Sequence, residues 1–202
     1  MKYGAILLAA GKGTRYKGTK QDVIFYDKPL WRYAYETALE VVGQDRTVAV
    51  GKDIAGGKTR TESVFNGLKA LSNDTERVII LEAARPMVTK EQVLTLLTDT
   101  HPSTTFVKPL VNTVVYRDGK YVNRDELYDL LTPQAFDYSM LLEAYQSGKF
   151  YDMTDETRVI FEYFGIKPHF IETEQNLFKV TYPGDLDIIE SIYLRLKNEG
   201  KL

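Results

Sequence analysis

Hydrophobic residues recur along the chain in two patterns, short continuous runs and stripes with a helical period. Continuous runs predict strands that are covered on both faces, as in a parallel sheet. The strands expected from these runs are residues 3–9, 47–50 and 77–81. Apolar residues spaced by three and four predict helices that begin near Pro29, Thr61 and Thr89, because this spacing places them on one face. The alternation of short strands with amphipathic helices indicates an α/β fold with a largely parallel sheet.

The pattern changes between residues 104 and 122. Here it predicts two strands joined at Asp118-Gly119, a dipeptide typical of tight hairpins. We interpret this segment as a β-arm that packs on the body of the protein or on a second subunit. The elements expected after it are helices at 138–145 and 155–164, strands at 168–172 and 178–180, and a closing helix at 183–196. Since no repeat or linker divides the chain, we expect one domain, residues 1–202, that carries the arm.

Composition narrows the function mainly by exclusion. The chain has 202 residues, of which 44% are hydrophobic and 27% charged, as is ordinary for one globular domain. A net charge of −2 gives no reason to expect nucleic acid or an anionic membrane as a partner, so any phosphate binding must come from locally placed cations. The absence of cysteine excludes disulfides and thiolate metal sites. With neither a signal-peptide pattern nor a long apolar run, a cytoplasmic location is the default expectation.

A glycine-rich turn, Ala9-Ala10-Gly11-Lys12-Gly13-Thr14-Arg15, follows the first predicted strand. Glycines let a backbone approach an anion and direct its amides toward it, while Arg15 and the later Lys20 would supply charge. Taken alone, such a segment is also typical of a plain turn. It is not a dinucleotide fingerprint, because Tyr16 occupies the position of the third glycine.

A second glycine-rich segment, Gly56-Gly57-Lys58-Thr59-Arg60, precedes the second predicted helix. It is not a P-loop, because the first glycine of that motif would fall at Lys52. A loop that leads into a helix cap is the structural interpretation of this segment, and binding of a nucleotide is the functional one.

Eight short motifs follow one another in order along nearly the whole chain. They are LLAAGKGTR (7–15), KQ (20–21), KPL (28–30), GGKTRTESVFNGL (56–68), AARP (83–86), NRDELYDLLTPQAF (123–136), TDE (154–156) and FKVTYPGDL (178–186). Taken together, they resemble the 2-C-methyl-D-erythritol 4-phosphate cytidylyltransferases and their relatives, the ribitol 5-phosphate cytidylyltransferases. The resemblance implies a three-layer α/β nucleotide-binding fold of the Rossmann-like nucleotidyltransferase type, with a mostly parallel sheet and a β-arm. It also implies a homodimer formed through the arms.

The resemblance further implies a cytidylyltransferase activity of isoprenoid biosynthesis. CMP would move from CTP to a polyol phosphate, 2-C-methyl-D-erythritol 4-phosphate in the main branch, with release of pyrophosphate. The acceptor's phosphate would attack the α-phosphorus directly, assisted by Mg²⁺ or another divalent cation. This chemistry requires positioning and positive charge rather than a covalent enzyme intermediate.

Roles for individual residues follow from the matched motifs. The predicted catalytic residues are Arg15, Lys20 and Lys179, which would stabilise charge at the reacting phosphates. The predicted nucleotide-binding residues are Ala9, Ala10, Gly11, Gly13, Arg15, Lys20, Gly56, Gly57, Arg60 and Ser63. The acceptor or the reacting phosphates would be bound by Arg85, Thr113, Arg124, Thr154 and Lys179. Without the resemblance, a solvated surface lysine would be the simpler interpretation of Lys20.

Two carboxylates, Glu82 and Asp185, are the predicted metal ligands. The family usually has aspartate at the position of Glu82, and glutamate keeps the charge but adds a methylene group. Asp185 equally suits the first turn of a helix, where acidic residues are favoured. Asn112-Thr113 departs from the usual Asp-Thr. The residues interpreted as structural, packing or surface positions are Thr132-Pro133-Gln134, Trp31, His101 and His169.

Two alternatives stay open. The chain is shorter than its relatives between the helix near 33–42 and Gly56, and together with Glu82 and Asn112 this points away from a standard member of the main branch. One alternative is therefore an enzyme for ribitol 5-phosphate or another sugar-alcohol phosphate of surface-polymer synthesis. The other is a homologue that binds nucleotide without catalysis. Four cations argue against it, because a binding-only protein would not need them all: Arg15, Lys20, Arg85 and Lys179.

Overall fold

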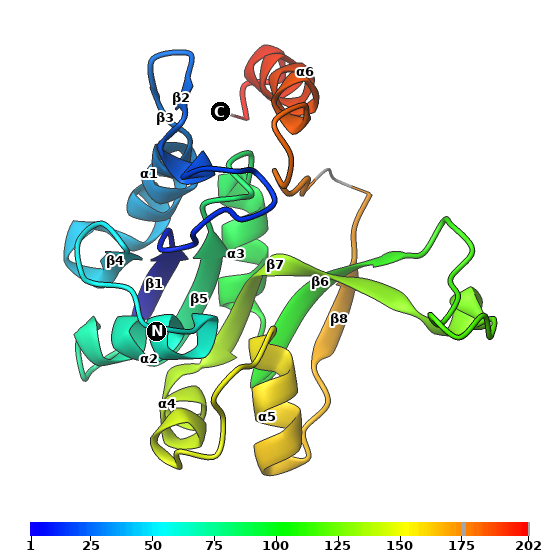
Figure 1. Cartoon of the computed structure of the whole chain (residues 1–202). Coiled ribbons are helices and arrows are strands. Elements are labelled where there is room, and N and C mark those ends of the chain that lie inside the picture. Colours follow the sequence, from blue (N-terminus) through cyan, green and yellow to red (C-terminus); the bar gives the residue numbers. More distant parts are fainter. Residues whose placement is uncertain (175–176, 202) are drawn as a thin grey trace.

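The computed structural model describes residues 1–174 and 177–201 and is built around one sheet with helices on both faces (Figure 1). In spatial order the strands are β4 (Thr47–Val50), β1 (Tyr3–Leu8), β5 (Arg77–Glu82), β7 (Tyr128–Asp137), β6 (Ser103–Pro109) and β8 (His169–Glu172). β1 is parallel to β4 and β5, and β6 is parallel to β8. Within the described residues, β7 alone runs in the opposite direction. The predicted α/β fold with a mostly parallel sheet is confirmed.

Both faces of the central strands are buried. In β5, Ile79 and Leu81 pack into one hydrophobic cluster, whereas Val78 and Ile80 pack into the other. Because neither face meets water, residues 78–81 of this strand are all apolar instead of alternating with polar residues. The first cluster is completed by α1 (Leu30–Val42) and α3 (Lys90–Thr98), and the second by α2 (Arg60–Ala70), α4 (Tyr138–Gln146) and α5 (Glu156–Phe164). The result is a three-layer arrangement of helices, sheet and helices.

A third cluster lies outside these layers. The last helix, α6 (Asp185–Asn198), packs Ile189 and Ile192 against Phe25 and the start of α1. Phe25 belongs to a separate hairpin of β2 (Ile24–Phe25) and β3 (Lys28–Pro29). No helix in the described part of the chain combines the length and hydropathy of a membrane span.

Two of the predicted strands are wrong. Residues 178–180 form no strand, because their backbone joins the body only at isolated points such as the bond from Val180 N to Ala84 O at 2.8 Å. In the 104–122 segment the first strand is β6, but the second is absent, and Val115 and Tyr121 form only an isolated bridge. The partner of β6 is instead β7, which carries polar residues among its apolar ones and was not predicted as a strand.

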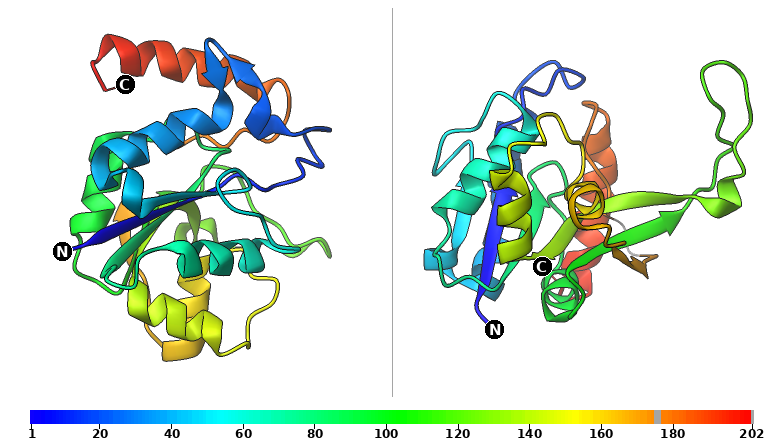
Figure 2. Two further views of the ribbon diagram at one scale, coloured as in Figure 1. Left: turned by 90° about the vertical axis from the view of Figure 1, so that its left-hand side faces the viewer. Right: turned by 90° about the horizontal axis from the view of Figure 1, so that it is seen from below.

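Residues 110–127, between β6 and β7, stand away from the body of the protein (Figure 2). They include a short 3-10 helix, η3 (Arg124–Glu126), and several exposed apolar side chains. Val111 is 82% exposed and Tyr121 is 80% exposed. Exposed apolar side chains of this size are unusual on a projecting segment, because burial of apolar surface is favourable.

β4 is an edge strand of the sheet, and the chain folds back directly after it. Residues 51–55 fold back over it: Ala49 N donates to Asp53 Oδ2 at 2.8 Å, and Gly51 N donates to Ile54 O at 2.7 Å. These bonds satisfy backbone groups near the strand end that would otherwise be unpaired. Gly51 has a φ of 96°, and a Cβ there would come within 2.7 Å of Ala10 Cα. The ends of β4 and β1 are therefore in close backbone contact.

Candidate active site

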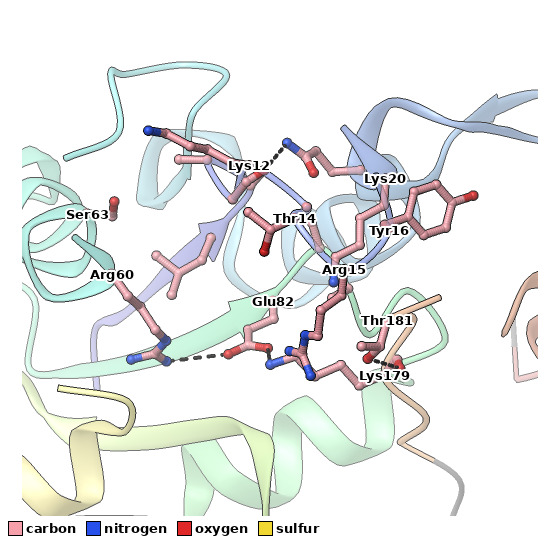
Figure 3. Close-up of a pocket in the computed structure, with 18 of the residues that line it drawn as sticks. Lys12, Thr14, Arg15, Tyr16, Lys20, Arg60, Ser63, Glu82, Lys179 and Thr181 are labelled. Carbon is pink, nitrogen blue, oxygen red and sulfur yellow. Dashed lines mark hydrogen bonds and ion pairs between the residues drawn. The ribbon is translucent and has the colours of Figure 1, made fainter. Parts of the chain in front are cut away.

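A pocket of about 420 Å³ opens at the carboxyl ends of β1 and β5 (Figure 3). Its wall is formed by residues 8–16 after β1, by 57–60 and Ser63 at the start of α2, and by 82–84 at the end of β5. Lys179 and Thr181 close the remaining side. In open α/β sheets this edge is where ligands bind, so the fold brings the two glycine-rich segments to the expected place.

The first glycine-rich loop is held in shape by one buried side chain. Gln21 is nearly inaccessible, and its Nε2 donates to Gly11 O at 2.9 Å. Gly13 has a φ of 59°, in the left-handed region that favours glycine, and its carbonyl accepts from Gly18 N at 3.4 Å. Gln21 was part of a sequence motif but had no predicted role, and the structure identifies it as a positioning residue for this loop.

The second glycine-rich loop leads into a capped helix. Thr59 Oγ1 accepts from Glu62 N at 3.1 Å, the usual N-cap contact of α2. Ser63 Oγ accepts from Gly57 N at 3.0 Å and donates to Thr59 O at 3.0 Å. The helix-cap interpretation of this segment is confirmed, and the same contacts hold Gly57 and Ser63 at the pocket wall.

A buried carboxylate, Glu82, lies at the centre of the charged groups. Its side chain is 12% exposed, pairs with Lys179 Nζ, and lies 3.5 Å from Arg60 Nη2. Burial alone would raise the pKa of Glu82, but Lys179 and Arg60 outweigh it and hold this pKa below the ordinary value. Glu82 is therefore ionised at neutral pH despite its burial.

Arg60 continues this network to a second buried carboxylate. Its guanidinium binds both oxygens of Glu156, with Nη2 at 2.7 Å from Oε2, and Tyr145 donates to Glu156 Oε1 at 3.1 Å. Burial alone would lower the pKa of Arg60, but Glu156 and then Glu82 outweigh it and raise this pKa. Arg60 thus lines the pocket while it is fixed between two carboxylates from β5 and α5.

The three predicted catalytic cations lie on one side of the pocket, away from Ser63 and Arg60 (Figure 3). Lys20 Nζ donates to Val180 O at 2.6 Å, which ties the first loop to the segment that carries Lys179. Burial lowers the pKa of Lys20, and the neighbouring charge of Lys179 lowers it further. Within the described residues, Arg15 makes no hydrogen bond or ion pair. The cluster therefore carries positive charge that its own carboxylates only partly balance.

The pocket does not contain every predicted site residue. Arg85 Nε donates to Thr132 Oγ1 at 2.9 Å and its Nη1 binds Leu177 O, so its guanidinium joins β7 to the segment before α6. The tight turn expected at Thr132-Pro133-Gln134 is wrong, because these residues lie within β7. Asp185 Oδ2 accepts from the backbone N–H groups of residues 181 and 182 at 2.6 and 2.8 Å, the helix-start alternative. The predicted residues outside the pocket lining are Gly56, Arg85, Thr113, Arg124, Thr154 and Asp185.

Several residues in the pocket wall, and one behind it, had no predicted role. Glu156 was quoted in the TDE motif only, yet it holds Arg60 in place. Other unassigned residues at the wall are Lys12, Thr14, Tyr16, Lys58, Thr59 and Thr181. Most of them are sequence neighbours of a glycine or a predicted site residue. Their position beside such residues could therefore have indicated them.

A glycine-rich loop and a surplus of cations at the carboxyl edge of a mostly parallel sheet define the class of this protein, an α/β protein with a nucleotidyltransferase-type fold. The family model described as IspD, 2-C-methyl-D-erythritol 4-phosphate cytidylyltransferase, matches residues 4–195. The chain belongs to this family.

Individual relatives cover nearly the whole chain. The chain is 34% identical over 214 residues to the 2-C-methyl-D-erythritol 4-phosphate cytidylyltransferase of Thermotoga neapolitana, covering 93% of this chain and 95% of the relative. It is 30% identical over 228 residues to the enzyme of the same name from Clostridium botulinum, covering 96% and 99%. Among solved structures, the 4-diphosphocytidyl-2C-methyl-D-erythritol synthase of Anaerococcus prevotii superposes with a TM-score of 0.77 at 25% identity, covering 96% and 98%.

The buried pair of Arg60 and Glu156 is expected to dominate the stability of this region. Glu156→Gln keeps the volume but removes the charge from a side chain that is 0% exposed, which leaves Arg60 undercompensated. We expect a loss of about 3–5 kcal/mol in the free energy of unfolding. The matched control is Glu162→Gln, which breaks a pair with Arg158 on the exposed face of α5 and should cost less than about 1 kcal/mol. Urea unfolding at pH 7 compares the two, and equal losses would contradict this role.

Proposed function

We propose that this chain transfers CMP from CTP to 2-C-methyl-D-erythritol 4-phosphate and releases pyrophosphate. The observation that carries the proposal is the convergence of Arg15, Lys20 and Lys179 on a pocket walled by two glycine-rich loops. Membership of the family and the names of its relatives supply the nucleotide and the acceptor. The lowered pKa of Lys20 supports it too: burial is its largest cause and the nearby Lys179 the next, and a bound polyanion would offset the repulsion between the two lysines.

The reaction is a direct displacement at phosphorus. An oxygen of the acceptor's phosphate attacks the α-phosphorus of CTP, a new P–O bond forms, and the bond to the pyrophosphate oxygen breaks. No general base is required, because a phosphate monoester is already an anion at neutral pH. The backbone of residues 9–13 binds the triphosphate, and Arg15, Lys20 and Lys179 stabilise the charge that builds up in the transition state. Gly57, Arg60 and Ser63 flank the opposite wall, where the nucleoside is held.

A divalent cation, Mg²⁺, fits this site with one protein carboxylate. Mg²⁺ keeps several waters and is bound through one or two carboxylates together with substrate phosphates. Glu82 is ionised, lines the pocket and would hold the ion, although its oxygens now face Lys179 and Arg60. The contacts of Asp185 with residues 181 and 182 fit a helix start better than a metal ligand. The ion would neutralise charge on the phosphates and orient them.

In this proposal, the acceptor's phosphate is bound by residues that lie outside the pocket lining of a single subunit. Thr113 and Arg124 lie on the projecting segment 110–127, far along the chain from the loops of the pocket (Figure 2). Arg85 follows the lining residue Ala84, and neither Arg85 nor Thr154 lines the pocket. A second subunit that contributes its arm would complete the acceptor side.

We therefore propose a homodimer formed through the arms. Its support is the exposed apolar surface of Val111, Val115, Tyr116 and Tyr121 on a segment that packs on nothing else in the described chain. Light scattering at micromolar concentration is expected to give twice the chain mass of 23.1 kDa. Replacing Tyr116 and Tyr121 by Ser should shift the mass toward the monomer, whereas a wild-type monomer would contradict the proposal.

A kinetic screen tests the reaction itself. Each of the four nucleoside triphosphates is combined with 2-C-methyl-D-erythritol 4-phosphate or ribitol 5-phosphate, and pyrophosphate release is followed with Mg²⁺ and with excess chelator. We expect the highest kcat/KM for CTP with 2-C-methyl-D-erythritol 4-phosphate, and no turnover in chelator. A higher kcat/KM for ribitol 5-phosphate would favour the surface-polymer alternative. Saturable CTP binding without turnover of any acceptor would favour the binding-only alternative.

Two lysines near the first loop provide a matched comparison. Lys12 and Lys20 both line the pocket, but only Lys20 lies beside Lys179 and contacts the 179–181 segment. Cations that act on a transferring phosphoryl group contribute about 10³–10⁵ in rate, whereas a cation that binds ground and transition states equally changes mainly KM. We expect Lys20→Ala to lose at least about 10²-fold in kcat and Lys12→Ala less than about 10-fold. Similar losses in kcat for both would refute the role of Lys20.

A further inference from the structure

Two histidines and one carboxylate meet at the end of the sheet opposite the pocket. Asp99 follows α3, His101 lies in the loop before β6, and His169 is the first residue of β8. These are the only histidines in the sequence. β6 and β8 pair in parallel, with Thr104 beside His169. The cluster is therefore at the amino edge of these strands, whereas the proposed active site is at the carboxyl edge of β1 and β5.

The spacing of the three side chains is close to what a metal ion requires. His101 Nδ1 lies 3.0 Å from Asp99 Oδ1, and His169 Nδ1 lies 2.9 Å from Asp99 Oδ2. One ligand atom from each residue lies within 4.8 Å of the other two. Tetrahedral bonds of about 2.0–2.2 Å separate ligand atoms by roughly 3.3 Å. Small rotations of the two rings would reach this geometry.

The cluster is also supported from behind. Thr104 Oγ1 donates to Asp99 Oδ1 at 2.6 Å, and the buried Arg77 donates from Nη2 to Thr104 Oγ1 at 3.1 Å. Arg77 Nη1 donates to His101 O at 2.7 Å, which fixes the loop that carries this ring. Outer contacts of this kind orient metal ligands and increase affinity. His101 and His169 are 55% and 40% exposed, so an ion can reach them from solvent.

We propose that Asp99, His101 and His169 bind a divalent transition-metal ion such as Zn²⁺. Two imidazoles with one carboxylate suit this class of ion, whereas Mg²⁺ prefers oxygen ligands throughout. Three protein ligands leave a fourth position for water. The ion would join the end of α3 to the first residue of the edge strand β8, 70 residues further along the chain. Its effect is therefore on the stability of this end of the sheet, and it is independent of the proposed reaction.

The test uses the full chain without a histidine tag, freed of metal by a chelator that is then removed. Calorimetric titration with Zn²⁺ is expected to show one ion per chain, and Co²⁺ should give the visible absorption of a bound, low-symmetry ion. Free Zn²⁺ at about 100 times its Kd should raise Tm by roughly 5 °C or more. His101→Ala and His169→Ala should each weaken Zn²⁺ binding at least about 10-fold. Lys167→Ala, an exposed change two residues from His169, should leave the affinity unchanged.

Two further measurements make the result decisive. Glu82→Gln removes the carboxylate of the active-site pocket and should leave Zn²⁺ binding intact, so its loss in this variant alone would assign the ion to that pocket and overturn the proposal. His101 is 55% exposed and its ring interacts with Asp99 and His169, so His101→Ala removes little buried surface and is expected to keep a Tm close to wild type in chelator. The proposal is also wrong if wild-type protein shows no saturable binding, or if both histidine variants bind as tightly as wild type.

Discussion

The ion pairs of one buried carboxylate, Glu82, hold together the elements at the carboxyl ends of the parallel strands. Glu82 ends β5 in surroundings where an ionised group without partners would be costly, so it requires cations close by. One of them, Arg60, comes from the start of α2, and the other, Lys179, comes from the segment before α6. Arg60 in turn requires Glu156, 96 residues further along the chain. β5, α2 and the segment before α6 are thus brought together, because leaving any of these buried charges without a partner would be costly.

The same network explains why the pocket suits a polyanion. Glu82 and Glu156 between them neutralise Arg60 and Lys179, but Lys20 and Arg15 are added on the same side without a carboxylate of their own. Burial lowers the pKa of Lys20, and the repulsion from the neighbouring Lys179 lowers this pKa further. A bound triphosphate would relieve this repulsion, and Lys20 and Lys179 are already held in place by contacts with Val180 O and Glu82. This preorganisation is what electrostatic catalysis requires, since the groups need not rearrange during the reaction.

The edges of the sheet have been closed in different ways. At β4, the backbone of residues 51–55 folds back and Asp53 satisfies Ala49 N, so the exposed edge of the sheet is partly covered there. Gly51 lets the end of β4 approach Ala10 closely, so the first glycine-rich loop is supported at the edge of the sheet. At β8, the opposite edge, Asp99 and the two histidines fasten the strand to α3. The pocket wall near β4 therefore depends on the local contact between Gly51 and Ala10.

Much of the architecture was determined by local sequence. Continuous apolar runs gave β1, β4 and β5, helical spacing gave α1, α2 and α3, and the glycine-rich turn after β1 lies at the pocket as predicted. These features depend on neighbours a few residues apart, so a pattern in the chain contains them.

What the tertiary structure alone decided are pairings between distant residues. β6 pairs with β7 across the arm and not with the nearer predicted strand. Arg85 donates to Thr132, and Asp185 accepts from backbone N–H groups at the start of its own helix. Two histidines that belong to no motif both contact Asp99. No local periodicity encodes such contacts, because each depends on which buried polar group and which strand edge still lacks a partner once the layers have packed.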